Sequence, residues 1–302
     1  MGGGSAEREI SLKTGKAIYA ALKRRGYQAS TIDVDVSLPW VLKRKKIDVA
    51  FLALHGPGGE DGTVQGMLDV LGIPYTGSGV RASAVGMNKS MTKALVEREG
   101  VPVVSGMCLQ KGEKTGPPKK LKWPLVVKPV DQGSTVGVSI VYTSAQWKTA
   151  LRRAWRQGSA VLAESYIDGR EIAVSVLDGK ALPTVEIVAP GGFYDFAAKY
   201  LKSETRYLCP APLTQRQDRQ MKEWAVRSYQ VLGCEGAARV DFRINTKGRP
   251  FFLEINTIPG MTERSLLPMA AAQARISYEA LTERILQSAL KRKTLGFKKS
   301  LP

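Results

Sequence analysis

Two acidic side chains near the end of the sequence have a spacing suited to metal chemistry. Asp241 and Glu254 belong to the apolar stretches 238–244 and 251–256, which read as two strands joined by a short polar turn. Side chains alternate along a strand, so a two-residue turn centred on 247–248 would place Asp241 opposite Glu254. Facing carboxylates repel unless a cation lies between them. We therefore expect a cation at this point of the hairpin.

The same register places Arg239 opposite Asn256. Mg²⁺ prefers one or two carboxylates plus phosphate oxygens, and the carboxamide oxygen of Asn256 can complete such a set with Asp241 and Glu254. The competing interpretation is a solvated hairpin face on which Arg239 and Arg243 neutralise the acids. The hairpin by itself leaves both interpretations open, and motifs elsewhere favour the first.

Two motifs in the middle of the sequence are candidates for nucleotide binding. Segment 126–138 reads as strand, glycine-bearing loop and strand, so its amides can fold over phosphates while Lys128 supplies a positive charge. The segment lacks the Walker A ending, and an ordinary hairpin explains it about as well. Glu164 closes the next strand, where it can bond an adenine edge, and Glu171 can accept from ribose hydroxyls. Surface acids at a strand end are the equal alternative.

Glycine-rich turns near helix starts are candidates for binding carboxylates. His55, the only histidine, ends a buried strand and precedes the glycine-rich turn 56–62 and a helix, where open α/β sheets place ligands. Glu7 lies in a similar loop, although a first-turn acid that stabilises the helix dipole explains it as well. Gly260 permits close backbone approach, and Ser265 can bind a carboxylate or cap the next helix.

The hydrophobic pattern predicts alternating helices and strands. At 302 residues the chain exceeds one ordinary core, so we expect two or three lobes around a shared cleft. The predicted helices are 11–25, 63–71, 82–99, 145–156, 215–232 and 278–290. The predicted strands beside the hairpin are 47–54, 125–128, 138–142, 160–166, 171–177 and 183–188, with a long irregular loop at 191–212.

Composition narrows the function classes. No apolar run is long enough to span a bilayer, and no secretory signal is present. Three dispersed cysteines suit a reducing cytoplasm. Lys and Arg outnumber Asp and Glu by 45 to 27, for a net charge of +18, so polyanion binding has to be considered. The basic residues are scattered and no nucleic-acid motif accompanies them, so we expect a solvated cationic surface and no nucleic-acid or membrane partner.

These motifs, in this order, resemble the D-alanine-D-alanine ligases of the ATP-grasp superfamily. The matching segments span nearly the whole chain: 5–9, 54–56, 59–62, 75–79, 128–129, 133–134, 199–200, 238–241, 254–257 and 259–262. The resemblance implies a three-lobed ATP-grasp fold that combines α/β and α+β parts. Its lobes are an N-terminal Rossmann-like α/β substrate lobe (1–86), a central ATP-grasp lobe (87–164) and a C-terminal ATP-grasp lobe with the Mg²⁺ and acceptor sites (165–302).

The resemblance also implies a reaction. ATP phosphorylates the carboxylate of one D-alanine, and the amine of a second D-alanine attacks the acyl phosphate, which gives the dipeptide for peptidoglycan synthesis. Two Mg²⁺ ions are expected, with Mn²⁺ able to substitute, on Asp241, Glu254 and Asn256. The implied ATP-binding residues are Lys89, Lys128, Glu164, Ile167, Glu171 and Lys199.

Roles toward D-alanine are implied in the same way. Glu7 binds the ammonium of the first D-alanine, His55 lies near its carboxylate, and Ser265 binds the carboxylate of the second. Arg239 and the Gly260 amide stabilise the oxyanion. A hydrogen-bonded triad is formed by Glu7, Ser134 and Tyr200, the last on the loop that closes over the reacting centre.

Several alternatives remain. Tyr200 argues against a D-alanine-D-lactate ligase, since ester-forming relatives replace it, and the set of Glu7, His55 and Ser265 argues against another ATP-grasp carboxylate-amine ligase. A basic nucleic-acid-binding protein is the distant alternative. A cytoplasmic homodimer is expected from the resemblance.

The start of the sequence departs from the family pattern. Relatives have a buried strand before the first glycine pair, where this sequence has Met1. We therefore expect the natural protein to start several residues upstream and this form to have a weakened first lobe, whose D-alanine affinity suffers more than its ATP affinity.

Overall fold

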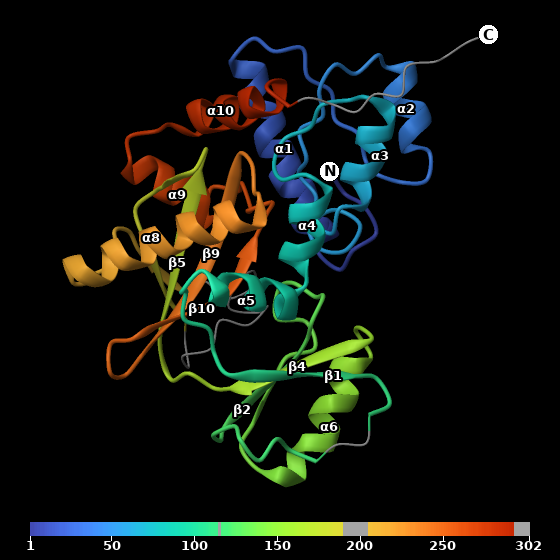
Figure 1. The fold of residues 1–302 in the computed structure, drawn as a ribbon. Coiled ribbons are helices and arrows are strands. Elements are labelled where there is room, and N and C mark those ends of the chain that lie inside the picture. The colour runs from blue at the N-terminus through green and yellow to red at the C-terminus, as the bar shows by residue number, and fades with distance from the viewer. Residues whose placement is uncertain (114–115, 190–204, 293–302) are drawn as a thin grey trace.

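The computed structural model describes residues 1–113, 116–189 and 205–292. Its helices are α1 (Arg8–Arg24), α2 (Leu38–Arg44), α3 (Thr63–Leu71), α4 (Val80–Met87), α5 (Lys89–Arg98), α6 (Ser144–Trp155), α8 (Gln215–Leu232), α9 (Leu266–Gln273) and α10 (Tyr278–Leu290) (Figure 1). Its strands are β1 (Gly106–Gln110), β2 (Leu125–Pro129), β3 (Ser139–Val141), β4 (Ala160–Ser165), β5 (Gly169–Leu177), β6 (Lys180–Ala181), β7 (Val185–Val188), β8 (Arg206–Leu208), β9 (Ala237–Asn245) and β10 (Pro250–Asn256). No described helix is long and apolar enough to cross a membrane.

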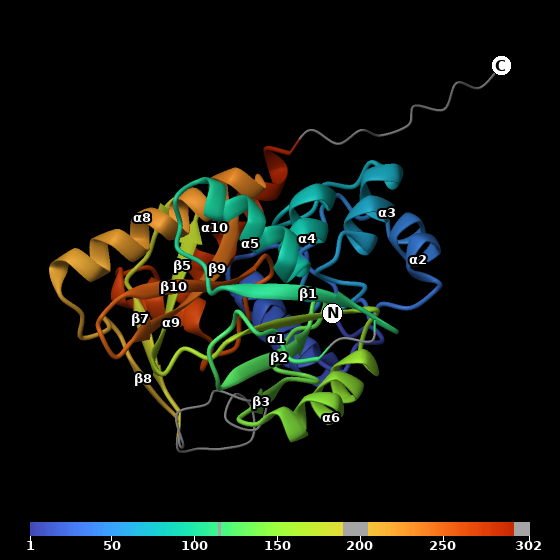
Figure 2. The ribbon, with the colours of Figure 1, turned by 60° about the horizontal axis from the view of Figure 1, so that its bottom comes forward.

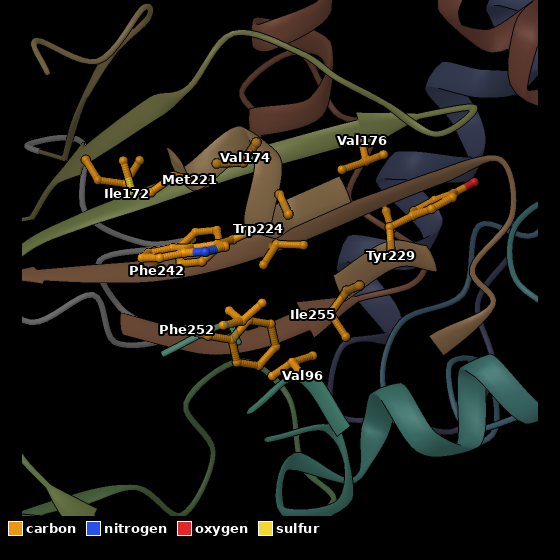
Figure 3. Close-up of a cluster of buried hydrophobic side chains, with 14 of the residues drawn as sticks. Val96, Ile172, Val174, Val176, Met221, Trp224, Tyr229, Phe242, Phe252 and Ile255 are labelled. Atoms are coloured by element: carbon orange, nitrogen blue, oxygen red, sulfur yellow. The ribbon is translucent and has the colours of Figure 1, made fainter. Parts of the chain in front are cut away.

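Two antiparallel sheets organise the described chain after α5. The smaller sheet has the order β1-β4-β2-β3 and packs on α6, whose Trp147 is almost fully buried. The larger sheet has the order β10-β9-β5-β7-β8, with β6 paired to β5. One face of it is covered by α8, where Trp224 and Met221 meet Phe242 of β9 (Figure 3). The other face packs against α9 and α10.

The N-terminal region departs from its predicted elements in two places. The first helix begins at Arg8 rather than at residue 11, and Ser11 lies inside it, where its hydroxyl accepts from Gly2 N at 2.8 Å and donates to Ala53 O. The predicted strand 47–54 forms only a parallel bridge between Ala50 and Tyr75. A buried apolar stretch therefore runs through this region in extended form but with little sheet pairing.

The predicted helix 82–99 is in fact two helices. Asn88 adopts an extended conformation (φ −85°, ψ 98°) between α4 and α5, and its side chain accepts from Met91 N at 2.9 Å to cap α5. In the fold, α4 contacts both α3 and α8, and α5 contacts α8 (Figures 1 and 2). The break turns α5 so that it packs on α8 and β10 of the larger sheet. The lobe boundaries at 86/87 and 164/165 stay predictions.

The predicted loop 191–212 contains a short strand. β8 pairs with β7 in antiparallel register, Tyr207 opposite Ile187. Residues 190–204, which include Lys199 and Tyr200, lie outside the described residues. Elsewhere the helices 63–71, 215–232 and 278–290 have the predicted bounds.

A groove of about 510 Å³ lies in the N-terminal region. Met1 makes parallel-strand bonds at its end, from its amino group to Ile32 O at 3.1 Å and from Val34 N to Met1 O at 3.0 Å. Apolar side chains from α1, from segment 29–34 and from segment 47–54 line this groove. Met1 is itself one of the residues that line this groove.

We predict that an apolar extension fused before Met1 fills this groove. About five valine- and isoleucine-rich residues span about 16 Å. Burying two of their side chains should contribute about 3 kcal/mol or more, which raises Tm by several degrees at about 2–4 °C per kcal/mol. The measurement is a thermal melt against a glycine-serine extension of equal length. Equal Tm values for the two extensions would contradict the prediction.

Candidate functional site

The β9–β10 hairpin has the predicted register at its polar residues. Glu254 pairs with Asp241, and Asn256 pairs with Arg239. The turn differs, because Gly248 N bonds to Asn245 O at 2.9 Å and Asn245 N to Arg249 O at 3.0 Å, so the loop holds three residues rather than two.

A β-bulge between Phe252 and Glu254 compensates for the extra turn residue. The bulge also decides which side chains enter the core. Phe252, not Phe251, is fully buried and packs edge-on against Phe242, with ring centroids 6.1 Å apart. Leu253 instead lines a cavity on the opposite side of the hairpin.

Both facing carboxylates are matched by cations. Arg239 donates to the two oxygens of Asp241 through Nε at 2.8 Å and Nη2 at 2.9 Å. Lys89 Nζ lies 3.2 Å from Glu254 Oε2. Asp241 is only 6% exposed, so the solvated-face interpretation fails for this residue. Arg243, expected there to neutralise the same acids, instead pairs with Glu171 at 3.2 Å.

The donor set fits magnesium that is shared with a phosphate. Asp241 and Glu254 offer hard oxygens across one ladder step, and Asn256 adds a carboxamide, whose oxygen here accepts from Ile258 N at 2.9 Å. Among the described residues no three His, Cys, Asp or Glu side chains form a metal-binding cluster. A magnesium ion held by Asp241, Glu254 and Asn256 would complete its octahedral set with water or phosphate oxygens.

The glycine loop after β2 meets the N-terminal loop at Glu7. The Ser134 hydroxyl donates to Glu7 Oε1, although the two residues are 127 positions apart, and both are buried. Ser134 (φ 49°) and Thr135 (φ 64°) both have positive φ, a strained conformation for side-chain-bearing residues. A Cβ at Gly133 would lie 3.1 Å from Glu7 Oε2. The loop therefore holds an unusual backbone shape that brings Ser134 onto the carboxylate.

His55 lies beside the same region and is buried. Its Nε2 lies 3.3 Å from the Thr14 hydroxyl, and its carbonyl accepts from Ser5 Oγ at 2.6 Å. Burial, and then the nearby Arg239, lower the pKa of His55 to about 4. His55 is therefore neutral at pH 7 and offers a hydrogen bond rather than a charge to a ligand.

Glu60 is a buried acid that the sequence reasoning did not assign. Its Oε2 accepts from Gly56 N at 2.7 Å, and its Oε1 is buried without a hydrogen-bond partner among the described residues. Burial, and then the charge of Glu7, raise the pKa of Glu60 to about 8. The available signal was an acid inside a glycine-rich turn that follows a buried strand.

Five of the six predicted nucleotide-binding residues line one cavity of about 110 Å³ between the two sheets, and the sixth, Lys199, lies outside the described residues. Those that line it are Lys89, Lys128, Glu164, Ile167 and Glu171. Arg243 and Tyr166 also line it, and the guanidinium lies 5.3 Å from the tyrosine ring centroid. Sequence reasoning missed this pair as site residues, because a tyrosine that follows β4 and an arginine on β9, a strand of the other sheet, form no sequence motif.

Gly260 and Ser265 lie against each other before α9. A Cβ at Gly260 would come within 2.8 Å of Ser265 Oγ, so only glycine fits there without movement. Ser265 is the N-cap residue of α9, and its hydroxyl accepts from Thr262 N at 3.0 Å. The structure thus brings together the predicted acceptor-site residues at a helix N-terminus.

Comparisons with known proteins decide the family. The protein-family model for the D-ala D-ala ligase C-terminus matches residues 95–287. The family model for the D-ala D-ala ligase N-terminus matches residues 42–78. The chain belongs to the D-alanine-D-alanine ligase family. A curated D-alanine-D-alanine ligase from Syntrophotalea carbinolica is 48% identical to this chain. The match covers 97% of this chain and 95% of the relative. One from Geobacter sulfurreducens is 46% identical, with coverages of 96% and 92%.

Solved structures agree with the D-alanine-D-alanine ligase assignment. The Bacillus anthracis D-alanine-D-alanine ligase complexed with ATP has a TM-score of 0.85 and 36% identity, and the match covers 96% of both chains. A second structure of that ligase has a TM-score of 0.86 and 38% identity. The ATP-grasp fold predicted from the sequence is therefore confirmed.

We predict that Glu60→Gln stabilises the protein at high pH. An ordinary Glu has a pKa of 4.5, so the unfolded state loses a proton that folded Glu60 keeps up to about pH 8. Stability of the wild type should therefore fall as the pH rises through this window. The glutamine variant avoids that loss, and its Tm advantage should grow from acid pH to about pH 8 and be small below the unfolded pKa.

Thermal melts across that pH range measure the effect. Glu97→Gln, on the exposed face of α5, is the matched control and should show no such trend. A Tm advantage of Glu60→Gln that does not change with pH would contradict the prediction.

Proposed function

We propose that this chain catalyses the ATP-dependent joining of two D-alanine molecules, through an acyl phosphate, to supply peptidoglycan synthesis. The names of its relatives support this reaction. The single observation that carries it is the contact of Ser134 with Glu7, whose carboxylate lies against Gly56, the residue after His55. That contact joins a phosphate-type loop to a buried carboxylate suited to an amino acid's ammonium group.

ATP is the proposed ligand of the cavity between the two sheets. The ATP complex of the Bacillus anthracis ligase supports it, as do Lys89 and Lys128, whose ammonium groups suit phosphate oxygens. Asp241, Glu254 and Asn256 would hold Mg²⁺, or Mn²⁺ in its place. When bound, the metal would neutralise phosphate charge during transfer.

The first D-alanine is proposed to bind between the N-terminal loops. Glu7 is a buried acid that an ammonium group can neutralise, and Ser134 fixes the orientation of its carboxylate. Neutral His55 can hydrogen-bond the substrate carboxylate without attracting the phosphate away from it. This arrangement orients one carboxylate oxygen for phosphorylation.

In the second step, the amine of the second D-alanine attacks the acyl carbon of the acyl phosphate. Negative charge then develops on the oxygen bonded to that carbon and needs a binding site. Asp241 fixes the plane of the Arg239 guanidinium through two hydrogen bonds, so the donors of Arg239 are preorganised. We propose that Arg239 and the Gly260 amide stabilise that oxyanion while Ser265 binds the second carboxylate. Roles for Lys199 and Tyr200 are proposed on the family resemblance alone.

Two broader properties are proposed from the same resemblance. A ligase that supplies peptidoglycan precursors works in the cytoplasm, where ATP is available. We also propose a homodimer, which mass photometry of the purified protein measures directly.

The test of the function is product formation from D-alanine. Phosphate release and mass spectrometry should detect D-alanyl-D-alanine only when ATP, Mg²⁺ and D-alanine are all present. L-alanine serves as the control substrate, and D-lactate in competition with D-alanine tests for an ester product. Absence of the dipeptide under these conditions, with the protein folded, would refute the proposal.

We predict that Glu254→Gln lowers turnover at least about 100-fold, comparable to removing one strong electrostatic group from an active site. The fold should persist, because glutamine keeps an oxygen that can accept from Lys89, and Lys89 also donates to Gln132 O. Phosphate release and a melting curve measure the two effects. The control is Glu263→Gln, an exposed residue before α9, which should keep turnover. Near-normal turnover of Glu254→Gln would remove Glu254 from the metal site.

A further inference from the structure

Three buried charged side chains meet at the wall of the nucleotide cavity. Glu164 of β4 accepts from Lys128 of β2 through Oε1 and from Lys93 of α5 through Oε2. None of the three residues is more than 8% exposed. Lys128 and Glu164 line the cavity, but Lys93 is not among the described residues that do so. Lys93 therefore reaches the carboxylate from behind the cavity wall.

The helix break at Asn88 sets up this contact. Lys89 and Lys93 stand four residues apart on α5, which places them on one face of the helix. Lys89 pairs with Glu254 of β10, and Lys93 pairs with Glu164 of β4. One short helix thus supplies a cation to an acid on each of the two sheets.

The charge balance of the cluster explains why a second lysine is present. A phosphate that enters the cavity competes with Glu164 for Lys128. If Lys128 were the sole cation, its departure would leave a buried carboxylate without compensation, which is strongly unfavourable. With Lys93 in contact, the carboxylate keeps one cation after Lys128 has turned to the phosphate.

We propose that Lys93 is a positioning residue, the resident counter-cation of Glu164, which frees Lys128 to bind the phosphates of the nucleotide. The inference rests on the proposed function, because it takes ATP as the ligand of this cavity. Lys93 does not contact the nucleotide. It acts on affinity through Glu164 and Lys128.

The charge state of Lys93 supports this role. Burial lowers the pKa of Lys93 to about 8, with Lys128 of β2 acting in the same direction and Glu164 of β4 and Glu254 of β10 acting against it. Lys93 is thus cationic at neutral pH and loses its proton at mildly alkaline pH. Lys128 and Lys93 together hold the pKa of Glu164 below its ordinary value despite burial.

The first experiment compares Lys93→Met, which removes the charge, with Lys93→Arg, which keeps it. Calorimetry with ATP and Mg²⁺ in the absence of D-alanine should show at least a tenfold loss of affinity for Lys93→Met and near-normal affinity for Lys93→Arg. KM for ATP should rise in Lys93→Met while KM for D-alanine changes little. Arg98→Met, an exposed change on the same helix, is the control and should behave as wild type.

The second experiment separates this role from simple support of the fold. Inorganic tripolyphosphate probes phosphate binding without the adenine. Lys93→Met should bind it weakly, whereas the double variant Lys93→Met/Glu164→Gln should regain affinity, because no carboxylate then retains Lys128. A structural strut would lose affinity in both variants.

The wild-type protein supplies a test that needs no substitution. Its ATP affinity should fall between about pH 7 and about pH 9 as Lys93 deprotonates, and the fall should be smaller in Lys93→Arg. Two outcomes would refute the role of Lys93 without touching the proposed function. In one, wild type and Lys93→Met bind ATP equally well; in the other, the double variant regains no affinity for tripolyphosphate. If wild type binds neither ATP nor tripolyphosphate, the proposed function fails and this inference fails with it.

Discussion

The structure depends on charge compensation for carboxylates that the fold removes from water. Glu7, Glu164 and Asp241 are each less than 9% exposed, and each meets a donor or cation from another residue. Burying an ionised carboxylate without such partners costs several kcal/mol, about half the stability of a domain. The positions of the compensating groups are therefore as important to this protein as those of the acids. Glu60, whose pKa is raised, is the exception that remains protonated instead.

The compensating groups come from different parts of the chain, which ties the site to the assembly of the whole fold. Ser134 reaches Glu7 from the smaller sheet, and Lys89 reaches Glu254 from a helix that precedes both sheets. Lys128 and Lys93 converge on Glu164 from a strand and from that same helix. These contacts join the N-terminal loop, α5 and the two sheets. Relative movement of these parts would therefore change the charge balance at the site. Such coupling is suited to an enzyme that has to bind three substrates in one place.

Local backbone shape contributes as much as charge at two loops. Ser134 and Thr135 adopt positive φ, which is costly for residues with side chains and persists where the surroundings enforce it. Gly260 approaches Ser265 so closely that any side chain would collide with the hydroxyl. Both loops carry residues that are proposed to act on D-alanine, so strain and close packing fall where the chemistry is proposed.

The sequence by itself determined the family and the fold of this protein. The predicted pairing of Asp241 with Glu254 holds because the bulge offsets the third residue of the turn. The two strands themselves were predictable from the alternation of polar and apolar residues, because strand periodicity is a local property of the backbone. Helices 215–232 and 278–290 were predictable for the same reason, since each has a continuous apolar stripe and a clear cap.

Tertiary structure decided what depends on contacts between distant segments. The three-residue turn and the bulge that offsets it could not be read locally, because packing of Phe252 rather than Phe251 on Phe242 selects that register. The break at Asn88 interrupts a pattern that is helical on both sides, and only its packing on the larger sheet turns α5 toward the acids. The roles of Lys93 and Glu60 emerged in the same way. A lysine in a helix or a glutamate in a turn has no distinctive pattern, and only burial beside Glu164 or Glu7 changes its protonation and its function.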